Sequence, residues 1–152
     1  MTIEIGQAAP DFALKNAANE VATLADFAGK PLLLVFYPFA FSGICEGELC
    51  RIRDDYSQFE SAGVQVVAVS CDNRHAQRVW GELQNYQFSF LSDFWPHGSA
   101  ATAYGIFNDA AGCAMRASFL IDAAGIVVDS FSTDDLGTPR EPERYAEAMA
   151  KL

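Results

Sequence analysis

One continuous apolar run constrains the fold of this chain more than any other feature. It reads LLLVFY at residues 32–37 and ends at Pro38. A run of this length without polar alternation fits a central strand that is covered on both faces. The segment VQVVAVS at residues 64–70 repeats the pattern and predicts a second buried strand. Two such strands require a sheet with other elements packed on both of its sides.

Helical spacing and turn residues predict the elements around these two strands. Residues 12–24 carry two short alternating segments separated by a polar turn, which predicts an N-terminal β-hairpin. The further elements expected are helices at about 43–62, 72–83, 99–104 and 142–152, and strands at 88–91, 105–108, 115–122 and 126–132. This order predicts an α/β fold with a mixed central sheet flanked by helices. Residues 137–142 are expected to be the most easily broken connection.

Length and charge narrow the range of partners. With 152 residues, of which 51% are hydrophobic, the chain is expected to form one domain over residues 1–152. The net charge is −10, and the ten lysines and arginines form no block or stripe. Because phosphate binding needs a basic surface, neither nucleic acid nor an anionic membrane is an expected partner.

The location expected from the sequence is the cytoplasm. The first twelve residues contain Glu4 and lack the basic and then apolar pattern of a signal peptide. The longest apolar run, residues 31–41, is too short to span a bilayer. In a reducing compartment, four cysteines suggest chemistry or simple burial before a disulfide framework.

Cys45 is the candidate nucleophile because of its position. The strand at residues 32–37 turns at Pro38 and leads into a helix that is expected to begin near Gly43, with Cys45 in its first turn. Free backbone N–H groups and the positive end of the helix dipole favour a thiolate there. The alternative is a small buried apolar side chain, which is the usual state of a free cysteine. Pro38 can shield the sulfur from water, and the hydroxyl of Ser42 can donate to it or accept from a substrate hydroxyl.

This arrangement, Pro38-x-x-x-Ser42-x-x-Cys45, resembles the peroxiredoxin signature. The resemblance extends over nearly the whole chain, from APDF at residues 9–12 to the R-x-x-F-x-I-D motif that begins at Arg116. SDFWPHG at residues 92–98 and FSGICEGEL at residues 41–49 are similar to the AhpE-type alkyl hydroperoxide reductases of actinobacteria. The resemblance implies a thioredoxin-like fold.

The resemblance also implies a role for each matching residue. Cys45 corresponds to the peroxidatic cysteine, Ser42 to the hydroxyl that positions the peroxide, and Pro38 to the shielding ring. Arg116 corresponds to an arginine that approaches from a distant strand, where its permanent charge would stabilise the thiolate. A salt bridge from Arg116 to Glu48 is an alternative, and both contacts can exist together. Glu48 is expected to orient an arginine and not to act as a base.

Cys50 departs from the AhpE-type pattern. The spacing Cys45-x-x-x-x-Cys50 is similar to the Q-type peroxiredoxins, in which the second cysteine resolves the first. In an intact helix this pair is offset by roughly 7.5 Å along the axis, which exceeds the ~7 Å limit for a disulfide. Resolution by Cys50 would therefore require unwinding. A half-buried spectator thiol, with an external thiol completing a one-cysteine cycle, is the alternative.

Three other functions are considered for the same residues. A thioredoxin-like disulfide oxidoreductase needs C-x-x-C, which is absent around Cys45. A zinc-binding module would need a second pair of ligands beside Cys45 and Cys50. Cys71 and Cys113 do not form such a pair, because they lie far apart in the sequence. A non-catalytic interaction protein on the same fold would be expected to lack Cys45 or Arg116. Cys71 is expected in the core, and Cys113 is not expected to act as the resolving thiol.

The resemblance implies a thiol-dependent peroxidase that acts through a Cys45 sulfenic acid. Its expected substrates are hydrogen peroxide, organic hydroperoxides and peroxynitrite, and no metal, haem or flavin is implied. The expected reductant is thioredoxin, glutaredoxin, or a mycoredoxin with a low-molecular-weight thiol. The resemblance also implies a homodimer packed near the active-site loops through four aromatic residues, Phe39, Phe41, Phe94 and Trp95.

Overall fold

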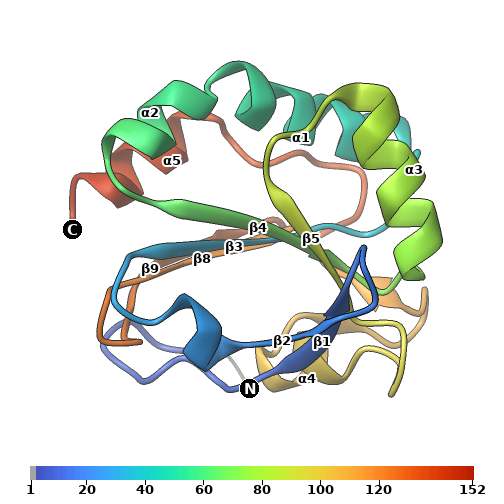
Figure 1. The fold of residues 1–152 in the computed structure, drawn as a ribbon, viewed down its shortest axis with the longest axis horizontal. Coiled ribbons are helices and arrows are strands. Elements are labelled where there is room, and N and C mark those ends of the chain that lie inside the picture. Colours follow the sequence, from blue (N-terminus) through green and yellow to red (C-terminus); the bar gives the residue numbers. More distant parts are fainter. Residues whose placement is uncertain (1–2) are drawn as a thin grey trace.

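The computed structural model of the protein describes residues 3–152 and contains a seven-stranded mixed sheet (Figure 1). Its strands lie in the order β2-β1-β5-β4-β3-β8-β9. They are β1 (Ala13–Asn16), β2 (Val21–Thr23), β3 (Leu32–Phe36), β4 (Gln65–Ser70), β5 (Ser89–Ser92), β8 (Ala117–Ile121) and β9 (Val127–Ser132). The predicted α/β class with a mixed central sheet is confirmed, and the N-terminal hairpin joins this sheet through pairing of β1 with β5.

Strand β3 lies in the middle of the sheet, as its apolar run predicts. All five of its residues are buried. It runs parallel to β4 and antiparallel to β8. Because successive side chains of a strand point to opposite faces, the run supplies two cores, with Leu32, Leu34 and Phe36 in one and Leu33 and Val35 in the other.

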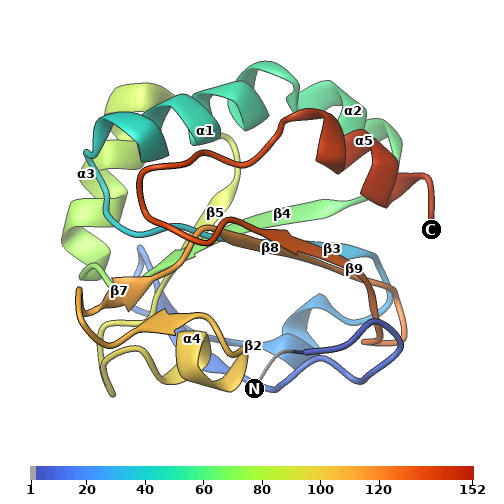
Figure 2. The ribbon, with the colours of Figure 1, turned by 180° about the vertical axis from the view of Figure 1, so that it is seen from behind.

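Helices cover the two faces unequally (Figure 2). On one face lie α1 (Gly43–Asp54), α2 (Tyr56–Ser61), α3 (Arg74–Gln84) and α5 (Glu143–Met149). The other face is covered by the short helix α4 (Ser99–Ala103) and a small hairpin of β6 (Phe107–Asn108) and β7 (Cys113–Ala114), while the 3-10 turn η1 (Leu24–Phe27) follows β2. Tyr104, directly after α4, is fully buried among the aromatic rings of Phe36 and Phe119.

Several element boundaries differ from the sequence-based expectation: β6 and β8 are shorter than the strands expected over residues 105–108 and 115–122, and β7 was not expected. The helix expected over residues 43–62 is divided at Asp55, whose φ of −97° and ψ of 14° leave the helical region. The Asp55 carbonyl accepts from the Gln58 N–H at 3.1 Å, which begins a new turn at this residue, and Asp is a weak helix former in a helix interior. The closing helix is also shorter than expected and occupies Glu143–Met149.

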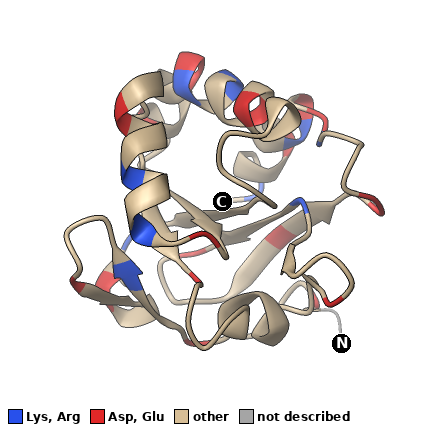
Figure 3. Ribbon diagram, turned by 90° about the vertical axis from the view of Figure 1, so that its right-hand side faces the viewer, with Lys and Arg blue, Asp and Glu red and all other residues tan. Residues whose placement is uncertain are grey.

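Along the ribbon in Figure 3, the lysines and arginines are scattered among the aspartates and glutamates. Within residues 3–152, no helix combines the length and the apolar character needed to cross a membrane. The same residues contain no group of three or more histidine, cysteine or acidic side chains arranged to hold a metal ion. Residues 3–152 therefore contain no cluster of side chains that would support the zinc-binding alternative.

Candidate active site

The first turn of α1 holds Cys45 as the sequence predicts. Ser42 is the N-cap residue, with an extended backbone, and its Oγ accepts a hydrogen bond from the Cys45 N–H at 3.4 Å. The Glu46 N–H donates to the Ser42 carbonyl at 2.9 Å and closes the first turn. Cys45 is fully buried. Cys45 thus lies in the first turn of α1, at the positive end of the helix dipole.

The loop before α1 is fixed by a carboxylate from the segment that follows β4. Pro38 is buried at the start of this loop. The Ala40 N–H donates to Asp72 Oδ2 at 2.8 Å, and Asp72 directly follows β4 and Cys71. Phe41 adopts a left-handed backbone with φ of 68°, which a non-glycine residue rarely does. This turn directs the chain into the N-cap at Ser42.

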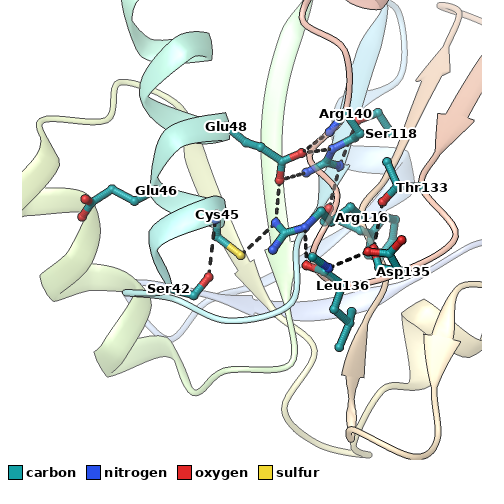
Figure 4. Close-up of polar contacts among 12 residues, drawn as sticks. Ser42, Cys45, Glu46, Glu48, Arg116, Ser118, Thr133, Asp135, Leu136 and Arg140 are labelled. Atoms are coloured by element: carbon teal, nitrogen blue, oxygen red, sulfur yellow. Dashed lines mark hydrogen bonds and ion pairs between the residues drawn. The ribbon is translucent and has the colours of Figure 1, made fainter.

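Arg116 lies next to Cys45 although 71 positions separate them in the sequence (Figure 4). Its Nη1 donates to Cys45 Sγ at 3.1 Å and to Glu48 Oε1 at 2.7 Å. Its Nε donates to the Leu136 carbonyl at 3.0 Å. The two contacts that the sequence left as alternatives therefore exist together. A guanidinium at this distance stabilises negative charge on the sulfur.

Glu48 lies between two arginines, and Arg140 is the one to which the sequence alone does not point. Arg140 Nε and Nη2 donate to Glu48 Oε2 at 2.9 Å and to Oε1 at 3.0 Å, and the Arg140 backbone N–H donates to Oε2 at 2.8 Å. Burial by itself raises the pKa of the Glu48 carboxyl, but the hydrogen bonds and charge of Arg140 and the bond from Arg116 outweigh it. The pKa of Glu48 is therefore lower than usual. Glu48 is a charged acceptor that orients both guanidinium groups.

Arg140 is anchored more deeply than a loop residue usually is. Its side chain is buried, and Nη1 donates to the Phe36 carbonyl at 2.7 Å and to Ser118 Oγ at 3.1 Å. These contacts tie residues 137–142, expected to be the most easily broken connection, to the ends of β3 and β8. The segment lies outside regular structure, so its sequence carries no periodicity that could reveal the contacts. Arg140 is one of ten lysines and arginines in the sequence, and residue type alone does not single it out.

Cys50 lies on α1 but faces away from Cys45. Its Sγ is 3.4 Å from the Tyr86 hydroxyl and 3.6 Å from Gln84 Oε1, both outside α1. Helix α1 is continuous from Gly43 to Asp54, so both cysteines belong to the same unbroken helix. The structure brings Ser42, Arg116 and Glu48 to Cys45 and does not bring Cys50 there.

The remaining cysteines are buried. Burial, together with the nearby charge of Asp93, raises the pKa of Cys71 to about 12. Burial and the nearby Cys45 likewise raise the pKa of Cys113, which is fully buried in β7. All four cysteines, which lie within the described residues, are free thiols in this structure.

Comparison with known proteins agrees with this geometry. The model of the AhpC/TSA family matches residues 5–130 of this chain. Alkyl hydroperoxide reductase E of Mycobacterium tuberculosis is 38% identical over 151 residues, which is 99% of this chain and 98% of that protein. The crystal structure of Enterococcus faecalis AhpC has a TM-score of 0.88 at 25% identity and covers 99% of this chain and 92% of that one. Peroxidoxin BcpB from Mycobacterium tuberculosis has a TM-score of 0.85 at 25% identity, with 98% and 96% covered.

The resemblance noted in the sequence is thereby confirmed at the level of the family. The fold is the thioredoxin-like fold of the peroxiredoxin structures. The relatives are named alkyl hydroperoxide reductases, peroxiredoxins and peroxide reductases. The chain belongs to the AhpC/TSA family and is a peroxiredoxin, a thiol-dependent peroxidase.

Proposed function

We propose that Cys45 is the peroxidatic cysteine. Its thiolate attacks the terminal peroxide oxygen, so an S–O bond forms while the O–O bond breaks. The departing oxygen leaves as hydroxide or alkoxide and takes a proton, which gives water or an alcohol and leaves Cys45 as a sulfenic acid. The observation that carries this proposal is the 3.1 Å contact between Arg116 Nη1 and Cys45 Sγ.

Arg116 and Ser42 have complementary roles in the proposed reaction. The guanidinium of Arg116 stabilises the thiolate before attack and the negative charge that develops on the peroxide oxygens during it. The hydroxyl of Ser42 contacts the incoming peroxide and orients it. Pro38 shields the sulfur from water. Holding the O–O bond in line with the sulfur lowers the entropy cost of reaching the transition state.

Glu48 and Arg140 position Arg116 and do not exchange protons with the substrate. Glu48 accepts from both arginines with a side chain that is only 6% exposed. Its lowered pKa keeps it ionised near neutral pH, which suits a fixed acceptor better than a base that must gain and lose a proton. Because the attacking species in the proposed step is the thiolate, no general base has to remove a proton from the sulfur during the attack.

The reductive half of the cycle has two routes, and both require movement because Cys45 is fully buried. An external thiol can condense with the sulfenic acid to a mixed disulfide and water; thioredoxin, glutaredoxin, or a mycoredoxin with a low-molecular-weight thiol fits this step. Cys50 can do the same within the chain once the first turns of α1 unwind, which Gly43 and Gly47 make easier. The intact helix supports the first route.

Hydrogen peroxide, organic hydroperoxides and peroxynitrite are the proposed substrates. All three present a terminal oxygen bonded to a second oxygen that can leave with a pair of electrons. The electrons for reduction come from thiols, so the cycle needs no metal, haem or flavin. A peroxidase that depends on a thiol reductant fits a reducing compartment, and we place the protein in the cytoplasm as a single domain over residues 1–152.

The proposed assembly is a homodimer formed near the active-site loops. Four aromatic side chains support it: Phe39, Phe41, Phe94 and Trp95 are 42%, 53%, 49% and 81% exposed. Large aromatic side chains left in water favour an interface. Sedimentation of wild type and Trp95→Glu tests this assembly: a dimer that becomes a monomer supports it, and a monomeric wild type contradicts it.

Peroxide-driven loss of free thiol tests the proposed nucleophile. Reduced wild type and Cys45→Ser are each treated with one equivalent of hydrogen peroxide, and the remaining thiols are titrated under denaturing conditions. Wild type is expected to lose thiol rapidly with a sulfenic acid at Cys45, whereas Cys45→Ser should keep its three thiols over the same time. Equal rates of loss in the two proteins would contradict the proposal.

A further inference from the structure

The orientation of Arg116 depends on contacts at both ends of its guanidinium. Nη1 is held by Glu48 at 2.7 Å, and Nε is held by the Leu136 carbonyl at 3.0 Å. Bonds to two different nitrogens fix the plane of the group as well as its position. The Nη1 that donates to Cys45 is thus aimed by Glu48 on one side and by a main-chain carbonyl on the other.

The Leu136 carbonyl lies in a loop between β9 and α5 and has no regular structure to hold it. Asp135 organises this loop (Figure 4). Its Oδ1 accepts from the Gly137 N–H at 2.8 Å, and both of its carboxylate oxygens accept from Thr138 Oγ1 at 2.9 Å. The Thr133 hydroxyl donates to the Asp135 carbonyl at 3.2 Å. These hydrogen bonds join residues on both sides of Leu136 in the sequence, namely Thr133 and Asp135 before it and Gly137 and Thr138 after it.

We infer that Asp135 is a positioning residue for Arg116, acting through the Leu136 carbonyl. The inference rests on the proposed function, in which Arg116 acts on Cys45. Asp135 is exposed, and its hydrogen bonds lie within its own loop, so it touches neither the sulfur nor the peroxide. Without its carboxylate, the loop loses the bonds that hold the Leu136 carbonyl against Arg116 Nε.

The chain offers a matched control next to the residue. Asp134 is also exposed, carries the same charge and makes no side-chain hydrogen bond in the described structure. Asp134→Ala therefore removes one negative charge from the same loop without removing its internal contacts. Asp135→Asn removes the same charge but keeps a side-chain oxygen that can accept from Gly137 and Thr138.

The experiment measures two rates at Cys45 in these variants at pH ~7. The first is oxidation by hydrogen peroxide, and the second is alkylation by iodoacetamide, which reports the thiolate without requiring peroxide. Asp135→Ala is expected to slow both by about fivefold, the effect of losing one hydrogen bond of ordinary strength. Asp134→Ala should match wild type, and Asp135→Asn should recover most of the rate.

A second measurement separates positioning from general loosening of the loop. In an Arg116→Ala background, Asp135→Ala should have no further effect, because the group through which it acts is absent. Equal rates in Asp135→Ala and Asp134→Ala, or the same slowing in the Arg116→Ala background, would overturn the inference. A wild type whose Cys45 resists peroxide would contradict the proposed function, while the alkylation rates would still decide the role of Asp135.

Discussion

Phe36 and Ala117 are paired across the antiparallel strands β3 and β8, and this register brings Arg116 to Cys45. Phe36 is the last residue of β3, so the chain leaves the sheet there and enters the loop that leads to Ser42. Arg116 directly precedes Ala117 and therefore enters the sheet at the same edge. A shift of one residue would turn the side chains of β8 to the opposite faces of the sheet.

The route of sulfenic acid reduction is tested by Cys50→Ser. Mass spectrometry after one equivalent of hydrogen peroxide should show no intramolecular disulfide in wild type, because Cys45 and Cys50 lie in one continuous helix. The variant should then behave as wild type does. A Cys45–Cys50 disulfide in wild type, with accumulated sulfenic acid and overoxidation in the variant, would instead establish Cys50 as the resolving cysteine.

Arg140→Met removes one partner of a buried ion pair. The side chains of Arg140 and Glu48 are 2% and 6% exposed, and the variant leaves the buried Glu48 with Arg116 as its remaining partner. Breaking a buried pair costs about 3–5 kcal/mol, and the bond from Arg116 that remains places the expected loss at the lower end of that range. The control is Arg51→Met, which breaks an exposed pair with Asp55 and should cost much less, because water screens an exposed ion pair. Urea unfolding measures both. Equal losses would show that Arg140 does not stabilise Glu48.

Glu48 makes stability depend on pH. Its pKa is below the ordinary value of 4.5 in the folded chain, where burial is outweighed by the bonds from Arg140 and Arg116. The unfolded chain therefore takes up this proton at higher pH, so the Glu48 contribution is complete above 4.5 and is lost as pH falls through the folded pKa. Urea unfolding of wild type and Glu48→Gln from pH ~7 to ~3 should give a stability difference that shrinks in acid. A difference independent of pH would contradict this linkage.

Cys71 should be chemically inert in the folded protein. Burial and the charge of Asp93 raise its pKa to about 12, so little thiolate exists near neutral pH. Peptide mass spectrometry after iodoacetamide treatment should find Cys71 unmodified in the native protein and modified in urea. Native labelling of Cys71 as fast as that of Cys50, which is half-buried, would contradict this expectation.

The parts of the fold that local pattern predicts are those with strong periodicity. The run at residues 32–37 predicts the central strand, and the Ser42–Gly43 step predicts where α1 begins. The break at Asp55 was not predicted, because helical spacing of apolar residues continues across it. Strand β6 lies within the strand expected at 105–108, but its partner β7 was not predicted, because two residues are too few for alternation to be recognised.

Some residues of the candidate site can be predicted from the sequence, and others cannot. The proposed nucleophile Cys45, the hydroxyl of Ser42 and the arginine at position 116 follow from motif spacing and family resemblance, whereas the role of Ser42 as the N-cap of α1 does not. Arg140 does not, because its bonds to Glu48 join positions 92 residues apart and leave no local pattern. The Leu136 carbonyl is a main-chain group, and no residue type specifies it. Contacts of both kinds become visible only when the fold is known.

The stopped-flow rate of Cys45 oxidation by hydrogen peroxide in Arg116→Ala tests the central claim most directly. Because Arg116 Nη1 lies 3.1 Å from Cys45 Sγ, its removal should slow the reaction at pH ~7 by about 100-fold, the effect of removing one preorganised donor. Arg78→Ala, which removes an arginine from an exposed pair with Glu82 on α3, should react as wild type does. An Arg116→Ala rate equal to that of wild type would contradict the claim.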